Sequence, residues 1–109
     1  MLKTLPKQKR SNFNKQGGIP MLYPIMTLVD GTEITSSKFT ETNSLLIYVE
    51  KWNPKHDDFD FFEMEIPSNV VTRCQGFSKS QINQISKHIT NLKEDIIDFV
   101  KEKEGIERA

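Results

Sequence analysis

The chain has 109 residues, enough for one domain with a single hydrophobic core. It carries 15 basic and 15 acidic residues and is 36% hydrophobic, a composition typical of a folded chain rather than a disordered one. A single cysteine excludes a disulfide framework and a thiolate-rich zinc site.

The balanced net charge hides an asymmetry along the chain. Residues 1–29 hold five basic residues and no acid, whereas residues 30–109 hold ten basic and fifteen acidic residues. Residues 1–20 also contain a glycine pair and two prolines, without the period of a helix or a strand. The sequence therefore predicts a flexible basic N-terminal arm at 1–20 and a single folded domain at 21–109. The basic residues of the arm are Lys3, Lys7, Lys9, Arg10 and Lys15.

The apolar segments are too short for a membrane-spanning helix, which needs about 20 residues. The longest uninterrupted apolar run is Leu45–Val49. Residues 19–29 follow a basic stretch, but two prolines and a following Asp-Gly-Thr-Glu segment argue against a signal peptide. We therefore expect a cytoplasmic protein with no membrane contact. A bias toward Ile, Lys, Asn, Phe and Tyr favours a bacterial or phage origin.

Residues 23–74 predict an antiparallel meander of four to five strands. The predicted strands are 23–29, 32–35, 45–52, 59–66 and 70–74. Asp30-Gly31 is a typical two-residue hairpin turn, in which Gly31 supplies the positive φ. In the fourth strand, alternation places Phe62, Met64 and Ile66 on one face and Glu63 and Glu65 on the other. The adjacent Phe61 and Phe62 interrupt this alternation and predict a bulge.

The C-terminal segment predicts one long helix of about seven turns, 78–104. Ser78 and Gln81 match a capping box, and Gly105 matches a helix stop. Apolar residues recur at helical spacing between these ends: Ile82, Ile85, Ile89, Leu92, Ile96 and Phe99. The expected fold class is α+β, with this helix packed against one face of the sheet.

The same apolar spacing is also that of a coiled-coil heptad, so a homodimer through the 78–104 helix is an alternative. Ile82, Ile89 and Ile96 would occupy the a positions, but the next a position is Lys103. Ile97 and Val100 widen the stripe, as expected of a helix that lies on a sheet. Packing against the chain's own sheet is therefore the favoured interpretation.

An acidic run with a neighbouring tryptophan is the candidate protein-docking surface. Such a run could also hold a divalent cation, but it lacks the spacing of a calcium loop, and we expect no metal and no cofactor. The aromatic residues Tyr48, Trp52, Phe59 and Phe61 could instead stack nucleic acid bases or fill the core. The docking residues are Trp52, Asp57, Asp58, Asp60, Glu63 and Glu65.

Three functions follow, in decreasing order of support. The first is a small non-enzymatic protein-interaction module of the inhibitor, immunity or regulatory accessory type, which docks onto another protein. The second is a nucleic-acid-binding protein that uses the five basic residues of the arm. The third is an enzyme built around His56 and its neighbouring carboxylates, or around Cys74 and a histidine, although no catalytic motif supports it.

Overall fold

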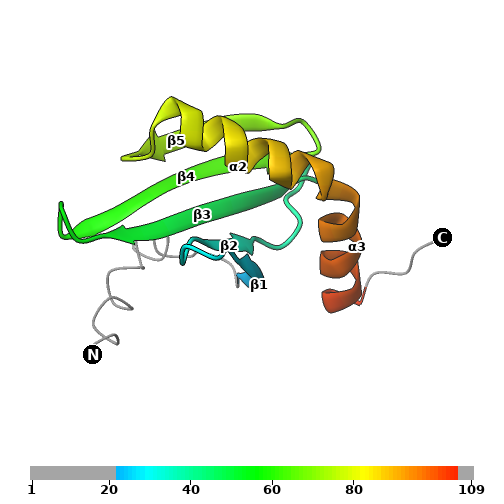
Figure 1. Cartoon of the computed structure of the whole chain (residues 1–109). Coiled ribbons are helices and arrows are strands. Elements are labelled where there is room, and N and C mark those ends of the chain that lie inside the picture. The colour runs from blue at the N-terminus through cyan, green and yellow to red at the C-terminus, as the bar shows by residue number, and fades with distance from the viewer. Residues whose placement is uncertain (1–21, 106–109) are drawn as a thin grey trace.

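The computed structural model describes residues 22–105, which form an antiparallel sheet and two helices (Figure 1). The strands are β1 (Tyr23–Thr27), β2 (Glu33–Ser36), β3 (Leu45–Asn53), β4 (Asp58–Ile66) and β5 (Val70–Gln75), and the helices are α2 (Lys79–Asn91) and α3 (Lys93–Lys103). Each strand pairs with the next, so the sheet order is β1-β2-β3-β4-β5. This confirms the predicted α+β class and the predicted meander. The predicted arm at residues 1–20 lies outside the described residues.

The turn between β1 and β2 is longer than the sequence predicted. Gly31 does take a positive φ of 93°, but its N–H donates to the Leu28 carbonyl. Leu28 in turn donates to the Thr32 carbonyl, so the loop is wider than the predicted two-residue turn. Asp30 stabilises this loop from within, because its carboxylate accepts hydrogen bonds from the backbone N–H and the hydroxyl of Thr32.

The longest pair, β3 and β4, runs in unbroken register from Leu45↔Ile66 to Asn53↔Asp58. The predicted bulge at Phe61-Phe62 is therefore wrong. The register instead shifts between β4 and β5, where Glu63 faces Arg73 and Met64 faces Val71, so that Thr72 is the extra residue. Because β4 keeps its alternation, the predicted division of its faces is confirmed, and Phe62, Met64 and Ile66 are fully buried.

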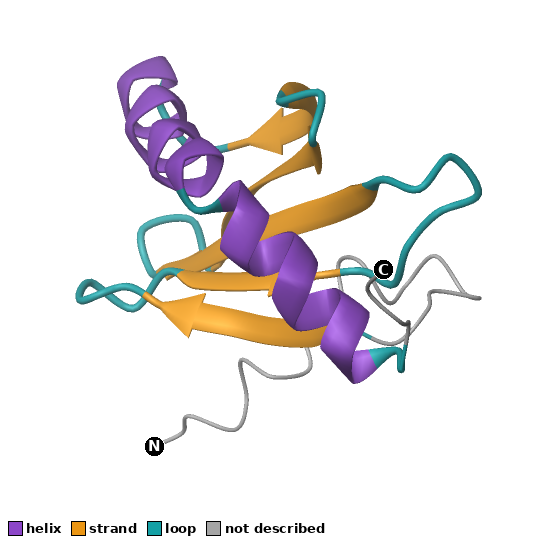
Figure 2. Cartoon of the chain, turned by 90° about the vertical axis from the view of Figure 1, so that its right-hand side faces the viewer, coloured by secondary structure: helices purple, strands orange, loops and turns teal. Residues whose placement is uncertain are grey.

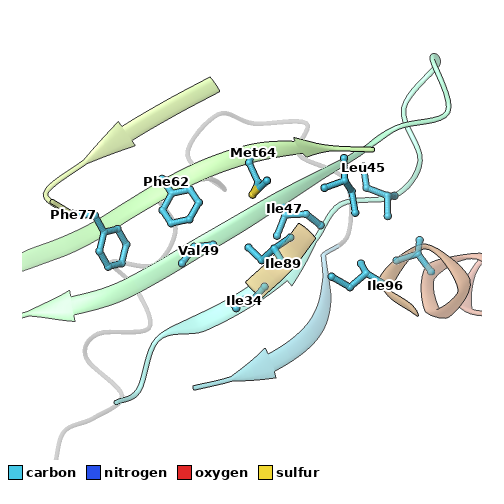
Figure 3. Packing of buried hydrophobic residues seen from close by; sticks show 11 residues of the cluster. Ile34, Leu45, Ile47, Val49, Phe62, Met64, Phe77, Ile89 and Ile96 are labelled. Carbon is cyan, nitrogen blue, oxygen red and sulfur yellow. The ribbon is translucent and has the colours of Figure 1, made fainter. Parts of the chain in front are cut away.

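The hydrophobic core lies between the sheet and the two helices. Strands β2, β3 and β4 contribute one apolar face, and Ile89, Ile96 and Val100 cover it from the helices (Figure 3). Phe77, just before α2, packs edge-on against Phe62 with ring centroids 5.7 Å apart. Both helices belong to this one side of the sheet. The strand residues of the core are Ile34, Leu45, Ile47, Val49, Phe62, Met64 and Ile66.

The predicted single long helix is wrong, because the chain bends at Leu92. This residue has φ −104° and ψ 7°, and its N–H is shared between the carbonyls of His88 and Ile89. The two helices consequently point in different directions (Figures 1 and 2). The bend allows Ile89 of α2 and Ile96 of α3 both to reach the chain's own core, at 1% and 3% exposure, so the predicted heptad seam is not continuous.

The helix ends match the sequence signals. Ser78 accepts a hydrogen bond from the N–H of Gln81, whose side chain accepts one from the N–H of Ser78, so the capping box is confirmed. Gly105 follows α3 with a positive φ of 71°. At this end Glu104 joins the first strand, because the Tyr23 hydroxyl donates to its carboxylate over 2.6 Å.

Candidate functional site

The candidate site is the sheet face opposite the helices, which we call the outer face. Successive residues of a strand point to opposite faces of the sheet, so the residues that alternate with the core residues lie on the outer face. On β3 these are the even-numbered residues and on β4 the odd-numbered ones. The residues of the outer face include Glu33, Leu46, Tyr48, Glu50, Trp52, Phe59, Phe61, Glu63, Glu65 and Arg73.

Strand register arranges these side chains in rows across the sheet. In one row Glu33 faces Glu50, which faces Phe61. In the next row Tyr48 faces Glu63, which faces Arg73. Residues directly opposite each other on neighbouring strands have Cβ atoms about 5 Å apart. Carboxylates and aromatic rings therefore lie side by side over the middle of the sheet.

Glu63 accepts two side-chain hydrogen bonds on the outer face. Its Oε1 accepts a hydrogen bond from Arg73 Nε at 3.1 Å and from the Thr72 hydroxyl at 2.8 Å. The bulge explains both contacts, because it brings Thr72 and Arg73 to the same neighbour on β4. Only 8% of Glu63 is exposed, and these two donors offset the cost of burying its polar oxygen.

Tyr48 shows how strongly this row is shielded from water. Burial, and then the negative charge of Glu63, raise the pKa of Tyr48 to about 12, with a hydrogen bond to Glu63 adding to the effect and Arg73 opposing it. Only 6% of Tyr48 is exposed. Glu50, its neighbour on the same face, is 9% exposed and lies across from Glu33. Both carboxylates add to the negative charge of the outer face.

The aromatic part of the outer face lies around the ends of β3 and β4. Trp52 contacts Phe59 edge to face, with centroids 5.3 Å apart and an interplanar angle of 74°. The Arg73 guanidinium lies over the Phe61 ring, 5.6 Å from its centroid. The face thus already holds one arginine by a carboxylate and an aromatic ring together, which is a common way to bind this group.

The structure divides the predicted docking residues among three places. Trp52, Glu63 and Glu65 share the outer face, with Trp52 and Glu65 toward opposite ends of the β3–β4 pair. Asp57 and Asp58 lie at the exposed tip of the β3–β4 hairpin.

Asp60 belongs to the other face of β4, the side of the core. Its carboxylate accepts a hydrogen bond from the Asn53 side chain and packs against Gly76. The sequence missed Glu33 and Glu50, although the alternation of β3 contained the signal for Glu50. The five basic residues of the predicted arm lie outside the described part of the chain.

The histidines and the cysteine considered for catalysis lie on three different parts of the fold. His56 is exposed in the β3–β4 turn, where its N–H donates to the Asn53 carbonyl. Cys74 is exposed on the edge strand β5, and His88 is exposed on α2. Within residues 22–105, no three His, Cys, Asp or Glu side chains form a group that could hold a metal ion.

Comparisons with family models, curated proteins and solved structures find no match to this chain. Among the helices of residues 22–105, none is long and apolar enough to cross a membrane.

Proposed function

We propose that this chain is a non-enzymatic protein-interaction module that binds a cationic segment of a partner protein on its outer face. The observation that carries the proposal is the row arrangement of carboxylates and aromatic rings across β2, β3 and β4. Inhibitor, immunity and regulatory accessory roles are all compatible with such a surface.

The chemistry of the face favours arginine and lysine side chains. Four carboxylates lie among the aromatic residues of the face, and Arg73 is the one basic member of the set that defines it. Glu33 and Glu65 are half-buried and can contact a partner, whereas Glu50 and Glu63 are buried and contribute their charge to the same face. Carboxylates steer a basic partner and pair with it, while aromatic rings bind the flat guanidinium or the lysine stem. The contacts of Arg73 with Glu63 and Phe61 are an intramolecular example of this mode of binding.

Charge favours a protein partner over nucleic acid for this face. Residues 22–105 hold nine basic and fourteen acidic residues, a net charge of −5. Such a surface repels phosphates, whereas it attracts a basic segment of a protein. Nucleic-acid binding by the arm at residues 1–20 stays a separate prediction from the sequence.

The proposal is tested by measuring peptide binding to two double variants, one with reversed charges on the outer face and one with the same charge change elsewhere. The probe is a short peptide of alternating arginine and glycine, whose binding is measured by calorimetry at two salt concentrations. Glu33→Lys with Glu65→Lys changes the outer face, and Glu94→Lys with Glu102→Lys makes the same charge change on the exposed side of α3.

We expect the outer-face pair to weaken binding about tenfold or more and the control pair to change it by less than about threefold. Circular dichroism confirms that both variants remain folded. An equal loss in the two variants contradicts the proposal, because binding would then depend only on total charge.

A further inference from the structure

We infer that the basic N-terminal segment of this same chain, residues 3–15, binds the outer face in cis and competes there with the basic partner. The inference rests on the proposed function, since it names the regulation of the same face. The segment would act as a built-in substitute for the partner, so that the partner has to displace it.

Charge complementarity is the first argument. The segment contains Lys3, Lys7, Lys9, Arg10 and Lys15 and no acidic residue, a net charge of +5. The outer face contains four glutamates and one arginine, a net charge of −3. The segment is the one part of the sequence with a strong positive excess, and its charge is opposite to that of the outer face. Phe13 adds an aromatic side chain that can pack against the rings of the face.

The length of the segment and the point where it joins the fold supply the second argument. The described chain starts at Leu22, next to β1, and neighbouring strands lie about 4.8 Å apart. Glu50 on β3 is thus about 10 Å across the sheet from β1, and Glu63 on β4 about 14 Å. Lys15 precedes Leu22 by seven residues, which extend up to about 23 Å. Every basic residue of the segment can therefore reach the acidic rows.

Covalent attachment makes even weak binding effective. The connection between Lys15 and Leu22 is short, and attachment over such a length gives an effective concentration in the millimolar range at the face. If a free peptide of this sequence bound with a dissociation constant near 100 μM, the attached segment would occupy the face about nine times in ten. A competing basic partner would then bind roughly tenfold more weakly than to an open face.

The experiment uses the full-length chain and a variant in which the five basic residues of the segment are changed to glutamine. Trp52 is the sole tryptophan and belongs to the outer face, so its fluorescence reports occupation of the face directly. The probes are the arginine–glycine peptide and a free peptide of residues 1–20. A matched control changes five exposed lysines elsewhere to glutamine: Lys38, Lys55, Lys79, Lys87 and Lys103.

We expect the segment variant to bind both probes about tenfold more tightly than the natural chain, with a changed Trp52 emission before any probe is added. The control should match the natural chain. If the segment variant and the natural chain bind the arginine–glycine peptide equally, the cis inference is overturned while the proposed function stands. If no chain binds that peptide, the proposed function fails, and the inference fails with it.

A second copy of the chain is the other source of a basic segment. Sedimentation measurements on the natural chain and the segment variant distinguish the two cases. A monomer in both supports binding in cis. A natural dimer that becomes a monomer when the segment is neutralised overturns the cis inference, because the segment would then bind the face of the partner copy.

Discussion

Gly76 lies against the carboxylate of Asp60 so closely that a Cβ atom on residue 76 would overlap it. Gly76 also has a positive φ of 88°, a conformation that other residues adopt at a cost. Gly76 is the residue that joins the end of β5 to Phe77, and the ring of Phe77 packs against Phe62 in the core. The glycine is thus needed here for space as well as for backbone conformation.

Gly76→Ala should destabilise the fold by more than Gly31→Ala does. At Gly31 φ is also positive, but nothing lies within 4 Å of the added Cβ, so this variant measures the backbone cost alone, about 1–2 kcal/mol. The excess at Gly76 measures the overlap with Asp60. Urea denaturation checks both variants, and adding Asp60→Ala to Gly76→Ala should remove most of the excess. Equal losses at the two glycines would show that the overlap has no cost.

Stability should fall above pH 10 through Tyr48. Its pKa is raised to about 12 in the folded chain, so between pH 10 and 12 the unfolded chain has lost a proton that the folded chain still holds. The contribution of Tyr48 is therefore complete below pH 10 and is lost as the pH rises toward 12, with a slope of up to about 1.4 kcal/mol per pH unit. Tyr48→Phe should flatten this part of the profile.

The measurement is urea unfolding from pH 9 to 12 for both chains. The pKa of Tyr23 is also raised, by its hydrogen bond to Glu104, so some slope will remain in Tyr48→Phe. Tyr23→Phe is the matched control, and it should keep the larger part of the slope. An unchanged profile in Tyr48→Phe contradicts the assignment.

Ile89→Ala should cost about 2–5 kcal/mol, because the side chain is 1% exposed and packs in the core. Ile82→Ala should cost less, because Ile82 is only partly buried near the start of α2. Denaturation at two protein concentrations measures both. In a coiled-coil dimer the two positions would be equivalent and the midpoints would depend on concentration, so that result would refute packing on the chain's own sheet.

Ser78→Ala should destabilise the chain by about 1 kcal/mol, since it removes the side chain that caps α2. Ser86 lies within the same helix, and its hydroxyl only bonds back to the Asn83 carbonyl. Ser86→Ala is therefore the control and should change stability by less than about 0.5 kcal/mol. Thermal unfolding of the two variants provides the comparison, and similar losses would argue against the cap.

The strands and their buried faces could be predicted from sequence, because both depend on the alternation of apolar and polar residues within a short segment. The order of the strands followed from their short connections, and the buried face of β4 followed from its period of two. The capping box was also predictable, because it is a local feature: Ser78 and Gln81 are only three residues apart in sequence.

The bend at Leu92 and the composition of the outer face could not be predicted in this way. The apolar spacing runs through Leu92 without interruption, so it gives no sign of the bend, after which Ile96 and Val100 still reach the core. Glu33 and Glu50 are seventeen residues apart in sequence and meet only through strand register. Asp60 was included in the predicted docking surface with its acidic neighbours, although the alternation of β4 already placed it on the face opposite Glu63 and Glu65, as the structure confirms.

The hydrogen bond between Tyr23 and Glu104 connects the two ends of the described chain. It joins the first strand to the residue that follows the last helix, 81 positions away in sequence. Glu104 also accepts a bond from the Phe39 backbone, so the loop before β3 belongs to the same junction. The first strand and the last helix should consequently exchange their amide protons as one unit, and loosening either end would open the other.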